Sequence, residues 1–236
     1  MNNKSIAEIV RENQNAGKVF DKYGIDYCCG GKLNFMEYCV KKNLDPILII
    51  NEISTDLDYK GQISFEEINN WHADLICDYI EKTHHRYLKE FFEILEAKIE
   101  KLVNRHGSNH PELIEIKNVM ISAQYELLMH LKKEELILFP AIIKIITAQL
   151  NNLPKEDFPF GSIANPINAM ENEHNHEGER LELLKKLTNN FTPPDDACQT
   201  YQSVYRILKE FYDDMHKHVY IENHILFPKV LSLEKI

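Results

Sequence analysis

Two segments with nearly the same layout constrain this chain more than any other feature. HLKKEELILFP begins at His130, and HVYIENHILFP begins at His218. In each segment a glutamate follows the histidine by four residues, Glu134 in the first and Glu222 in the second. Four residues are slightly more than one turn of an α-helix, so each pair projects from one face. The sequence therefore predicts two helices that carry equivalent His-x-x-x-Glu pairs.

Both pairs lie on apolar helix faces. At helical spacing, the first pair shares its stripe with Ala123, Leu127, Leu138, Ala141 and Ile145, and the second with Val204, Leu208, Phe211, Met215 and Leu226. Such a stripe faces the core of a helical protein, which predicts that all four side chains point inward. Ile-Leu-Phe-Pro ends each segment, and because proline has no N–H for the helical hydrogen bond, we expect a kink there.

Two more histidines extend this pattern. His84 continues an apolar stripe and is predicted to point inward, whereas His85 falls beside charged residues and is predicted to lie on a polar face. His174 likewise continues an apolar stripe. His130 follows His84 by 46 residues, and His218 follows His174 by 44. These similar intervals predict two related helical hairpins, each with one inward histidine and one inward His-x-x-x-Glu pair.

The spacing of apolar residues is helical along most of the chain, and only 8 glycines and 9 prolines interrupt it, so we predict an all-α fold. Short helices are expected at about 5–12, 14–23, 33–42 and 45–57, and long helical segments at about 65–105, 111–149, 164–190 and 195–232. We interpret residues 1–60 as a small helical domain and residues 61–236 as an antiparallel four-helix bundle.

Charge and composition exclude several classes of protein. The 236 residues include 37 acidic and 27 basic side chains, and the resulting charge of −10 opposes binding to nucleic acid or an anionic membrane. No apolar run reaches the roughly 18 residues of a membrane span, and MNNKSIAEIVREN lacks the features of a signal peptide. We therefore expect a cytoplasmic protein whose five scattered cysteines are mainly reduced thiols.

Six inward ionisable side chains are costly in an apolar bundle unless something coordinates them. A pair of metal ions can coordinate all six side chains. Each neutral imidazole binds one metal ion, and each carboxylate has two oxygens with which to bridge the two ions. Imidazole and carboxylate ligands without thiolate favour iron or manganese over zinc or copper(I), and we interpret the site as two non-haem iron ions with an oxo or hydroxo bridge. The predicted ligands are His84, His130, Glu134, His174, His218 and Glu222.

Four other side chains have two readings each. Glu126, one turn before His130, and Glu173, next to His174, are either hydrogen-bond partners of the ligands or proton relays, or else surface acids. In DYCCGGK, Cys28 and Cys29 precede a predicted helix, where thiols can have a lowered pKa and act in redox chemistry or metal binding. They are equally well read as small buried side chains in a turn.

These motifs together resemble the RIC family, the di-iron proteins for repair of iron centres. The resemblance rests on CCGG, His84, HLKKEELILFP, ENEH and HVYIENHILFP, and covers nearly the whole chain. It implies a hemerythrin-like four-helix bundle, the same six metal ligands, and a role in restoring iron-sulfur clusters damaged by nitric oxide or oxidants. The family's cysteine pair matches Cys28 and Cys29.

The resemblance favours repair by iron donation or by nitric oxide removal. The implied partners are damaged iron-sulfur proteins or scaffold proteins, with nitric oxide or dioxygen as a small ligand, and the chain is a candidate homodimer. A hemerythrin-like protein that binds or senses dioxygen or nitric oxide is one alternative. An enzyme that reduces nitric oxide at the two irons is another.

Overall fold

The structure is a computed structural model, and it describes residues 4–55, 63–154 and 156–234. Within these ranges the chain consists of helices and connecting loops, with one isolated bridge between Ser5 and Asn34 and no strand, which confirms the all-α prediction. Contacts divide the chain into two compact units, residues 1–76 with 219–236 and residues 77–218. The predicted domain boundary at residue 60 lies outside the described residues.

The first unit contains short helices. They are α1 (Ile6–Glu12), α2 (Asn15–Lys22), α3 (Phe35–Lys42), α4 (Pro46–Thr55), α5 (Phe65–Asn69), the start of α6 (Ala73–Ile80), and the carboxyl-terminal segments η3 (Glu222–Leu226) and α12 (Phe227–Glu234). Ser5 and Ser64 begin α1 and α5 with capping boxes, in which the hydroxyl accepts from the backbone of Glu8 or Glu67 and that glutamate accepts from the serine backbone.

The carboxyl-terminal helical segment packs onto α1 and α5 within the first unit. The buried Tyr220 hydroxyl donates to the carbonyl of Ala7 over 2.6 Å, and its ring stacks on Phe65 with centroids 4.2 Å apart. Farther along, the Lys229 ammonium donates to the carbonyls of Asn69 and Trp71. These contacts fix the position of the segment that begins with Glu222 within this unit.

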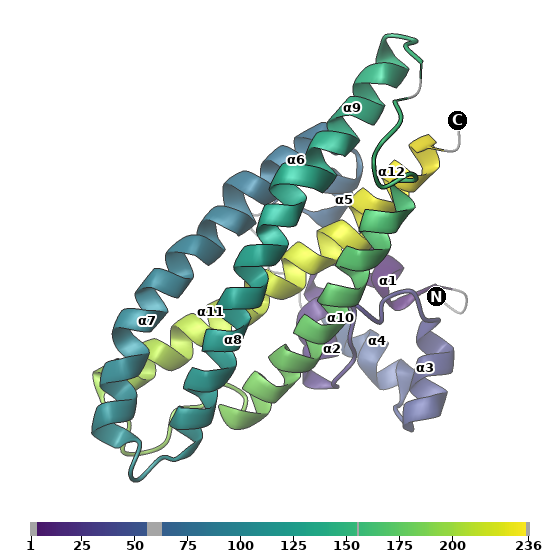
Figure 1. The fold of residues 1–236 in the computed structure, drawn as a ribbon. Coiled ribbons are helices and arrows are strands. Elements are labelled where there is room, and N and C mark those ends of the chain that lie inside the picture. The colour runs from purple at the N-terminus through teal and green to yellow at the C-terminus, as the bar shows by residue number, and fades with distance from the viewer. Residues whose placement is uncertain (1–3, 56–62, 155, 235–236) are drawn as a thin grey trace. The chain divides into compact units, whose positions relative to one another are not determined.

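The second unit is the helical bundle (Figure 1). Its elements are the rest of α6, η1 (Glu81–His85), α7 (Arg86–His106), α8 (Glu112–Lys133), η2 (Glu134–Leu138), α9 (Phe139–Leu150), α10 (Ala164–Leu187) and α11 (Gln199–Ile221) up to residue 218. Helix α8 contacts α7 and α10. Helix α7 contacts α11 through Phe91 and Phe211, whose stacked rings have centroids 4.6 Å apart.

Three of the long helical rods contain a π-helical turn. These turns are η1, η2 and η3, and each includes or begins with one of the ionisable residues of the core. In the last two, the N–H of Phe139 bonds to the carbonyl of Glu134, and that of Phe227 to Glu222, five residues back. Pro140 and Pro228 follow directly, so the wide turns occur where proline removes an ordinary helical hydrogen bond.

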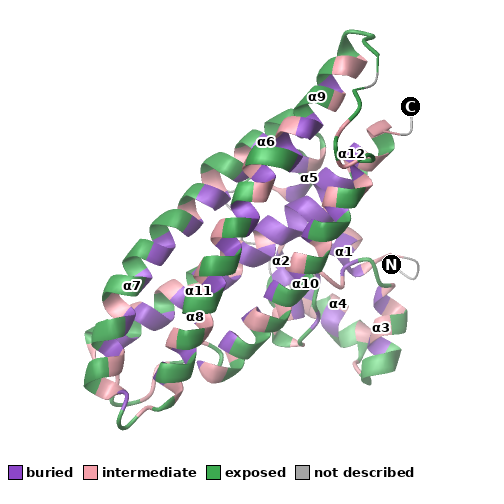
Figure 2. Ribbon diagram, viewed as in Figure 1, coloured by how far each residue is buried: buried purple, intermediate pink, exposed green. Residues whose placement is uncertain are grey.

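Buried residues line the inner faces of the helices (Figure 2). Most are apolar, but the bundle also buries several histidines and glutamates in mid-helix. Among the described helices, none combines the length and apolar character that crossing a bilayer requires. The buried ionisable residues are therefore the feature of the core that needs a chemical explanation.

Candidate metal centre

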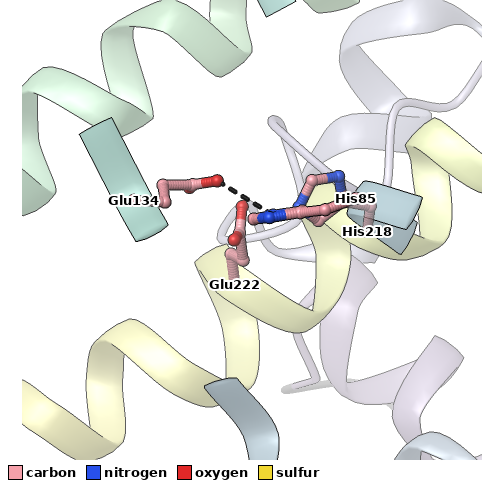
Figure 3. A group of neighbouring side chains, drawn as sticks. All are labelled: His85, Glu134, His218 and Glu222. Carbon is pink, nitrogen blue, oxygen red and sulfur yellow. Dashed lines mark ion pairs between the residues drawn. The ribbon is translucent and has the colours of Figure 1, made fainter. Parts of the chain in front are cut away.

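Two overlapping groups of buried side chains have the arrangement of a metal site. The first is His85, Glu134, His218 and Glu222, shown in Figure 3, and the second is His130, Glu134, His174 and Glu222. In each group, one potential ligand atom from every residue lies within 4.8 Å of the others. Both groups contain the same two carboxylates, so the geometry fits two neighbouring cations, each with two imidazoles and a share in two glutamates.

Glu134 joins the two groups directly. It is fully buried, and its two oxygens face different imidazoles: Oε2 lies 3.2 Å from Nε2 of His85, and Oε1 lies 3.3 Å from Nε2 of His130. A carboxylate placed in this way can bridge two metal ions. The first turn of η2 sets this position, because Glu134 follows His130 by four residues on the same rod.

His218 and Glu222 occupy the equivalent positions on the last rod. Helix α11 continues into η3 without a break, so Glu222 follows His218 by one turn. Both residues are fully buried. The duplicated His-x-x-x-Glu pattern of the sequence thus corresponds to two rods that each contribute an imidazole and a carboxylate.

The outer nitrogen of His85 has a carboxylate partner. Its Nδ1 lies 2.9 Å from Oε1 of Glu135, which also accepts from the Lys89 ammonium at 2.8 Å. Burial raises the pKa of Glu135, but the hydrogen bonds from Lys89 and His85 outweigh it and leave that pKa below its usual value. An ionised Glu135 holds the proton of His85 on Nδ1 and leaves Nε2 available for a metal.

His130 has the same arrangement with Glu173. Its Nδ1 donates to Oε2 of Glu173 over 2.9 Å, and Lys133 donates to the other oxygen over 2.5 Å. The hydrogen bond from His130 is the main reason that the pKa of Glu173 falls to about 2, with Lys133 contributing and burial opposing. On the inner side, Nε2 of His130 lies 3.2 Å from Nε2 of His174. Two imidazole nitrogens that converge in this way fit a shared cation.

His84 lies beside these groups rather than in them. Its Nδ1 contacts Asp214 at 2.9 Å, and its ring is parallel to that of His218 with centroids 5.4 Å apart. The prediction that His85 lies on a polar face is wrong, because His85 is fully buried. The π turn over Glu81–His85 explains the difference. A π turn contains more residues per turn than the 3.6 of an α-helix, so α-helical spacing does not predict which of the two histidines faces the centre.

A pocket of about 390 Å³ reaches His130 and His174 from one side of the bundle. Glu126 lines it and forms an ion pair with Arg180 at 2.5 Å. Glu177, which the sequence analysis did not select, also lines it and pairs with Arg180. Burial raises the pKa of Glu177 to about 7 despite this arginine. Glu177 follows His174 by three residues on the same helix, and this spacing could have predicted that the two side chains lie on one face.

The cysteine pair lies in the first unit, in a turn organised by Asp26. The Asp26 carboxylate accepts from the backbone of Cys28 and Cys29, and the two sulfurs are 3.7 Å apart. Cys28 is buried, and its contact with Cys29 and its burial raise its pKa well above the usual value, which favours the reading of this thiol as a small buried side chain. Ligand atoms of Asp26, Cys28 and Cys29 lie within 4.8 Å of one another.

The carbonyl of Cys28 ties this turn to the carboxyl-terminal rod. It accepts from Nδ2 of Asn223 at 3.2 Å and from Nε2 of His224 at 2.7 Å. These two donors directly follow Glu222 in η3. The turn that carries the thiols and the segment that carries a buried carboxylate are therefore packed together in the same unit.

Comparison with known proteins supports the reading of the core. Residues 78–230 match the hemerythrin HHE cation-binding domain. The chain belongs to this hemerythrin HHE family. Residues 2–56 of this hemerythrin-family chain match the ScdA_N domain, a domain of unknown function. The cation-binding character of the family agrees with the two buried His and Glu groups of the bundle.

Several curated relatives match this hemerythrin-family chain along nearly its full length. It is 31% identical to iron-sulfur cluster repair protein ScdA of Staphylococcus haemolyticus, over 97% of this chain and 98% of the relative. It is 34% identical to a probable iron-sulfur cluster repair protein of Haemophilus influenzae and 32% identical to iron-sulfur cluster repair protein YtfE of Escherichia coli O81, over 97% of both chains in each case. The predicted resemblance is confirmed.

Proposed function

We propose that this chain repairs damaged iron-sulfur clusters and that it does so with two iron ions held in the bundle. The relatives named for cluster repair support the activity. The observation that carries the metal assignment is the pair of buried groups that share Glu134 and Glu222. Nitrogen and oxygen donors without thiolate favour iron or manganese, and cluster repair favours iron.

The proposed ligands follow the geometry of the two groups. His85 and His218 would hold one ion and His130 and His174 the other, with Glu134 and Glu222 available to both. His85 replaces His84 of the sequence prediction because His85 belongs to a group and His84 does not. Two irons bound there would supply redox chemistry and positions for a small ligand such as nitric oxide or dioxygen.

The surrounding residues orient the proposed ligands. Glu135 and Glu173 contact Nδ1 of His85 and His130, which turns Nε2 of each ring toward the proposed centre. Arg180 and Lys133 line the pocket beside His130 and His174, through which a small molecule can reach that side of the centre. The first unit supplies Cys28 and Cys29 as candidate redox or metal-binding thiols.

Rescue of a damaged enzyme tests this proposal. Iron-loaded protein should restore activity to a [4Fe–4S] enzyme inactivated by nitric oxide, whereas His130→Ala and Glu222→Ala proteins should not. His72→Ala is the matched control, because His72 is exposed and should not affect the rescue. Equal rescue by the metal-free protein would refute the role of the centre.

Iron labelled as ⁵⁷Fe distinguishes the two modes of repair. If the chain donates iron, the label should move from the protein into the restored cluster, as seen by Mössbauer spectroscopy. If the chain removes nitric oxide, the label should stay with the protein while the cluster recovers from unlabelled iron. Damaged iron-sulfur proteins are the proposed partners in either case.

A further inference from the structure

A chain of polar contacts leads from the surface of the bundle to a buried carboxyl group. The hydroxyl of Ser122 donates to Oε1 of Glu126 over 2.9 Å, and Oε2 of Glu126 accepts from Nη2 of Arg180 over 2.5 Å. Nη1 of Arg180 donates to Oε2 of Glu177. The chain of contacts joins α8 to α10, which pack against each other within the second unit (Figure 1), and it ends at Glu177, which is 4% exposed.

The other oxygen of this carboxyl group, Oε1 of Glu177, has no hydrogen-bond partner among residues 4–55, 63–154 and 156–234. Burial of a polar atom without a partner costs free energy. The charge of Arg180 does not explain this cost, because Arg180 already pairs with Glu126 and lowers the pKa of that carboxyl group. A second carboxyl group at this place therefore indicates a hydrogen-bond partner that comes from outside the chain.

The pocket of about 390 Å³ connects Glu177 with two of the proposed metal ligands. Glu177 lines it together with His130 and His174. Its volume is well above the roughly 30 Å³ that one water molecule occupies, so a diatomic or triatomic ligand has room between these side chains. Another charged pair of the pocket, Lys133 and Glu173, is already engaged, since Glu173 accepts from both Lys133 and His130. A small molecule beside His130 and His174 thus meets Glu177, which has an available oxygen.

Glu177 can act as a hydrogen-bond donor. Burial is the main cause that raises its pKa to about 7, against the lowering effect of Arg180 and His130. At neutral pH the carboxyl group therefore holds a proton in a large share of the molecules. Because Nη1 of Arg180 donates to Oε2, the proton resides on Oε1. A protonated carboxyl oxygen is a donor, and it is available to an acceptor atom on a bound ligand.

We propose that Glu177 donates a hydrogen bond from Oε1 to a small ligand on the ion that His130 and His174 would hold, and that Arg180 positions this carboxyl group. The inference rests on the proposed function, because it requires a metal ion at these two histidines. The ligand class is a small molecule whose outer atom carries negative charge when it binds a metal, such as nitric oxide, dioxygen or azide. A hydrogen bond to a charged acceptor is shorter and stronger than one between neutral groups, so Glu177 would stabilise this class of ligand more than a neutral one.

Azide is the probe for ligand affinity, and its binding to the iron-loaded protein is measured by an absorbance titration. Glu177→Met keeps the length of the side chain but removes the donor, so the dissociation constant should rise about tenfold, as for the loss of a hydrogen bond to a charged group. Glu177→Gln retains a donor and should bind azide nearly as tightly as the wild-type chain. Glu179→Met is the matched control, because Glu179 is exposed on the same helix.

Infrared spectra separate the hydrogen bond from packing. In the wild-type chain and in Glu177→Gln, the stretching band of bound azide should shift when heavy water replaces light water, because the donated proton exchanges for deuterium. The shift should be absent in Glu177→Met and in Glu177→Ala, and the alanine variant also tests whether the longer methionine blocks the ligand. Arg180→Met should reduce the shift and weaken azide binding several-fold, because the Glu177 carboxyl group loses the donor that holds Oε2.

Iron analysis distinguishes failure of this inference from failure of the proposed function. A wild-type chain that binds no iron would overturn the proposed function and this inference with it. Iron-loaded Glu177→Met protein with the azide affinity and the deuterium shift of the wild-type chain would overturn this inference alone. Absence of a deuterium shift in the iron-loaded wild-type chain would do the same, and this measurement depends on no variant.

Discussion

Nδ1 of His130 donates to the Glu173 carboxylate over 2.9 Å, while Nε2 of the same ring points into the buried group. Glu173 is held in place by Lys133 on its other oxygen. This contact fixes both the orientation of the imidazole and the nitrogen that carries its proton. His85 makes the equivalent contact with Glu135, so the bundle contains this imidazole–carboxylate arrangement twice.

Removal of the Glu173 carboxylate should weaken the metal centre without removing a ligand. Glu173→Ala frees the ring of His130 to rotate and to change its protonated nitrogen, so we expect metal affinity to fall about 10- to 100-fold. Competition for ferrous iron with a chromophoric chelator measures this change. Glu179→Ala is the control, because Glu179 is exposed on the same helix. Unchanged affinity in the Glu173 variant would show that the hydrogen bond does not support a ligand.

Substitution of the adjacent histidines should have unequal effects. His85→Ala removes an imidazole from the first group, so we expect about one iron ion per chain to remain tightly bound. His84→Ala removes a ring that contacts Asp214 and stacks on His218, and should leave two ions bound. Iron analysis after gel filtration provides the comparison. The opposite order of losses would assign the ligand to His84.

Five of the six residues that periodicity selected belong to the two buried groups, and His84 lies outside them. His130, Glu134, His218 and Glu222 each precede or begin a π turn, so the regular part of the helix before them gives their phase. His84 and His85 lie inside such a turn, where the phase changes within the segment. No proline follows this turn, unlike the turns before Pro140 and Pro228, so the sequence does not mark its position.

The fold was predictable wherever capping or breaking residues mark the helices. The first three short helices lie within two residues of their predicted ends, with Ser5 and Asn34 as side-chain caps, and the predicted end of the fourth at residue 57 lies outside the described residues. The predicted single helix from 65 to 105 is wrong, since α5 ends at Asn69 and α6 begins at Ala73. Neither glycine nor proline marks that break. The sequence also could not identify Glu135 as the partner of His85 or Asp214 as the partner of His84, because these pairs form by contacts between different helices.

His110 should make the stability of the chain depend on pH. Its Nε2 contacts Asp196 at 3.2 Å and its Nδ1 contacts Glu112 at 2.9 Å, and these carboxylates, Asp196 foremost, raise its pKa. A raised pKa in the folded state stabilises the protein below the unfolded pKa of about 6.5, and this contribution is lost as pH rises through the folded value. His110→Gln should therefore lower stability at pH 5.5 and have less effect at pH 9.

The expected size of this effect is small. Asp196 is 63% exposed, so the contribution should be at most about 1 kcal/mol, or a few degrees in Tm. Thermal unfolding at both pH values measures it, with His72→Gln as the control for an exposed histidine. A loss of stability that is the same at both pH values would indicate that packing, not charge, accounts for the contribution of His110.

Two glycine substitutions should separate crowding from backbone strain in the first unit. A Cβ at Gly31 would lie 2.3 Å from the carbonyl of Tyr27 and 2.6 Å from Nε2 of His224, so Gly31→Ala must displace backbone or the bond from His224 to Cys28. Overpacking of this kind costs about 1–3 kcal/mol. Gly24 has φ of +65° and open space around its Cβ position, so Gly24→Ala should cost about 1 kcal/mol through strain alone.

The two variants should also differ in the reactivity of the thiols. Movement of His224 removes one of the two side-chain donors to the carbonyl of Cys28, so Gly31→Ala should expose the buried Cys28 to a thiol reagent, whereas Gly24→Ala should leave its modification rate near that of the wild-type chain. Urea unfolding gives the two stability losses, and mass spectrometry after timed labelling gives the rate at Cys28. Slow labelling of Cys28 in Gly31→Ala protein that stays folded would show that His224 does not hold this turn closed.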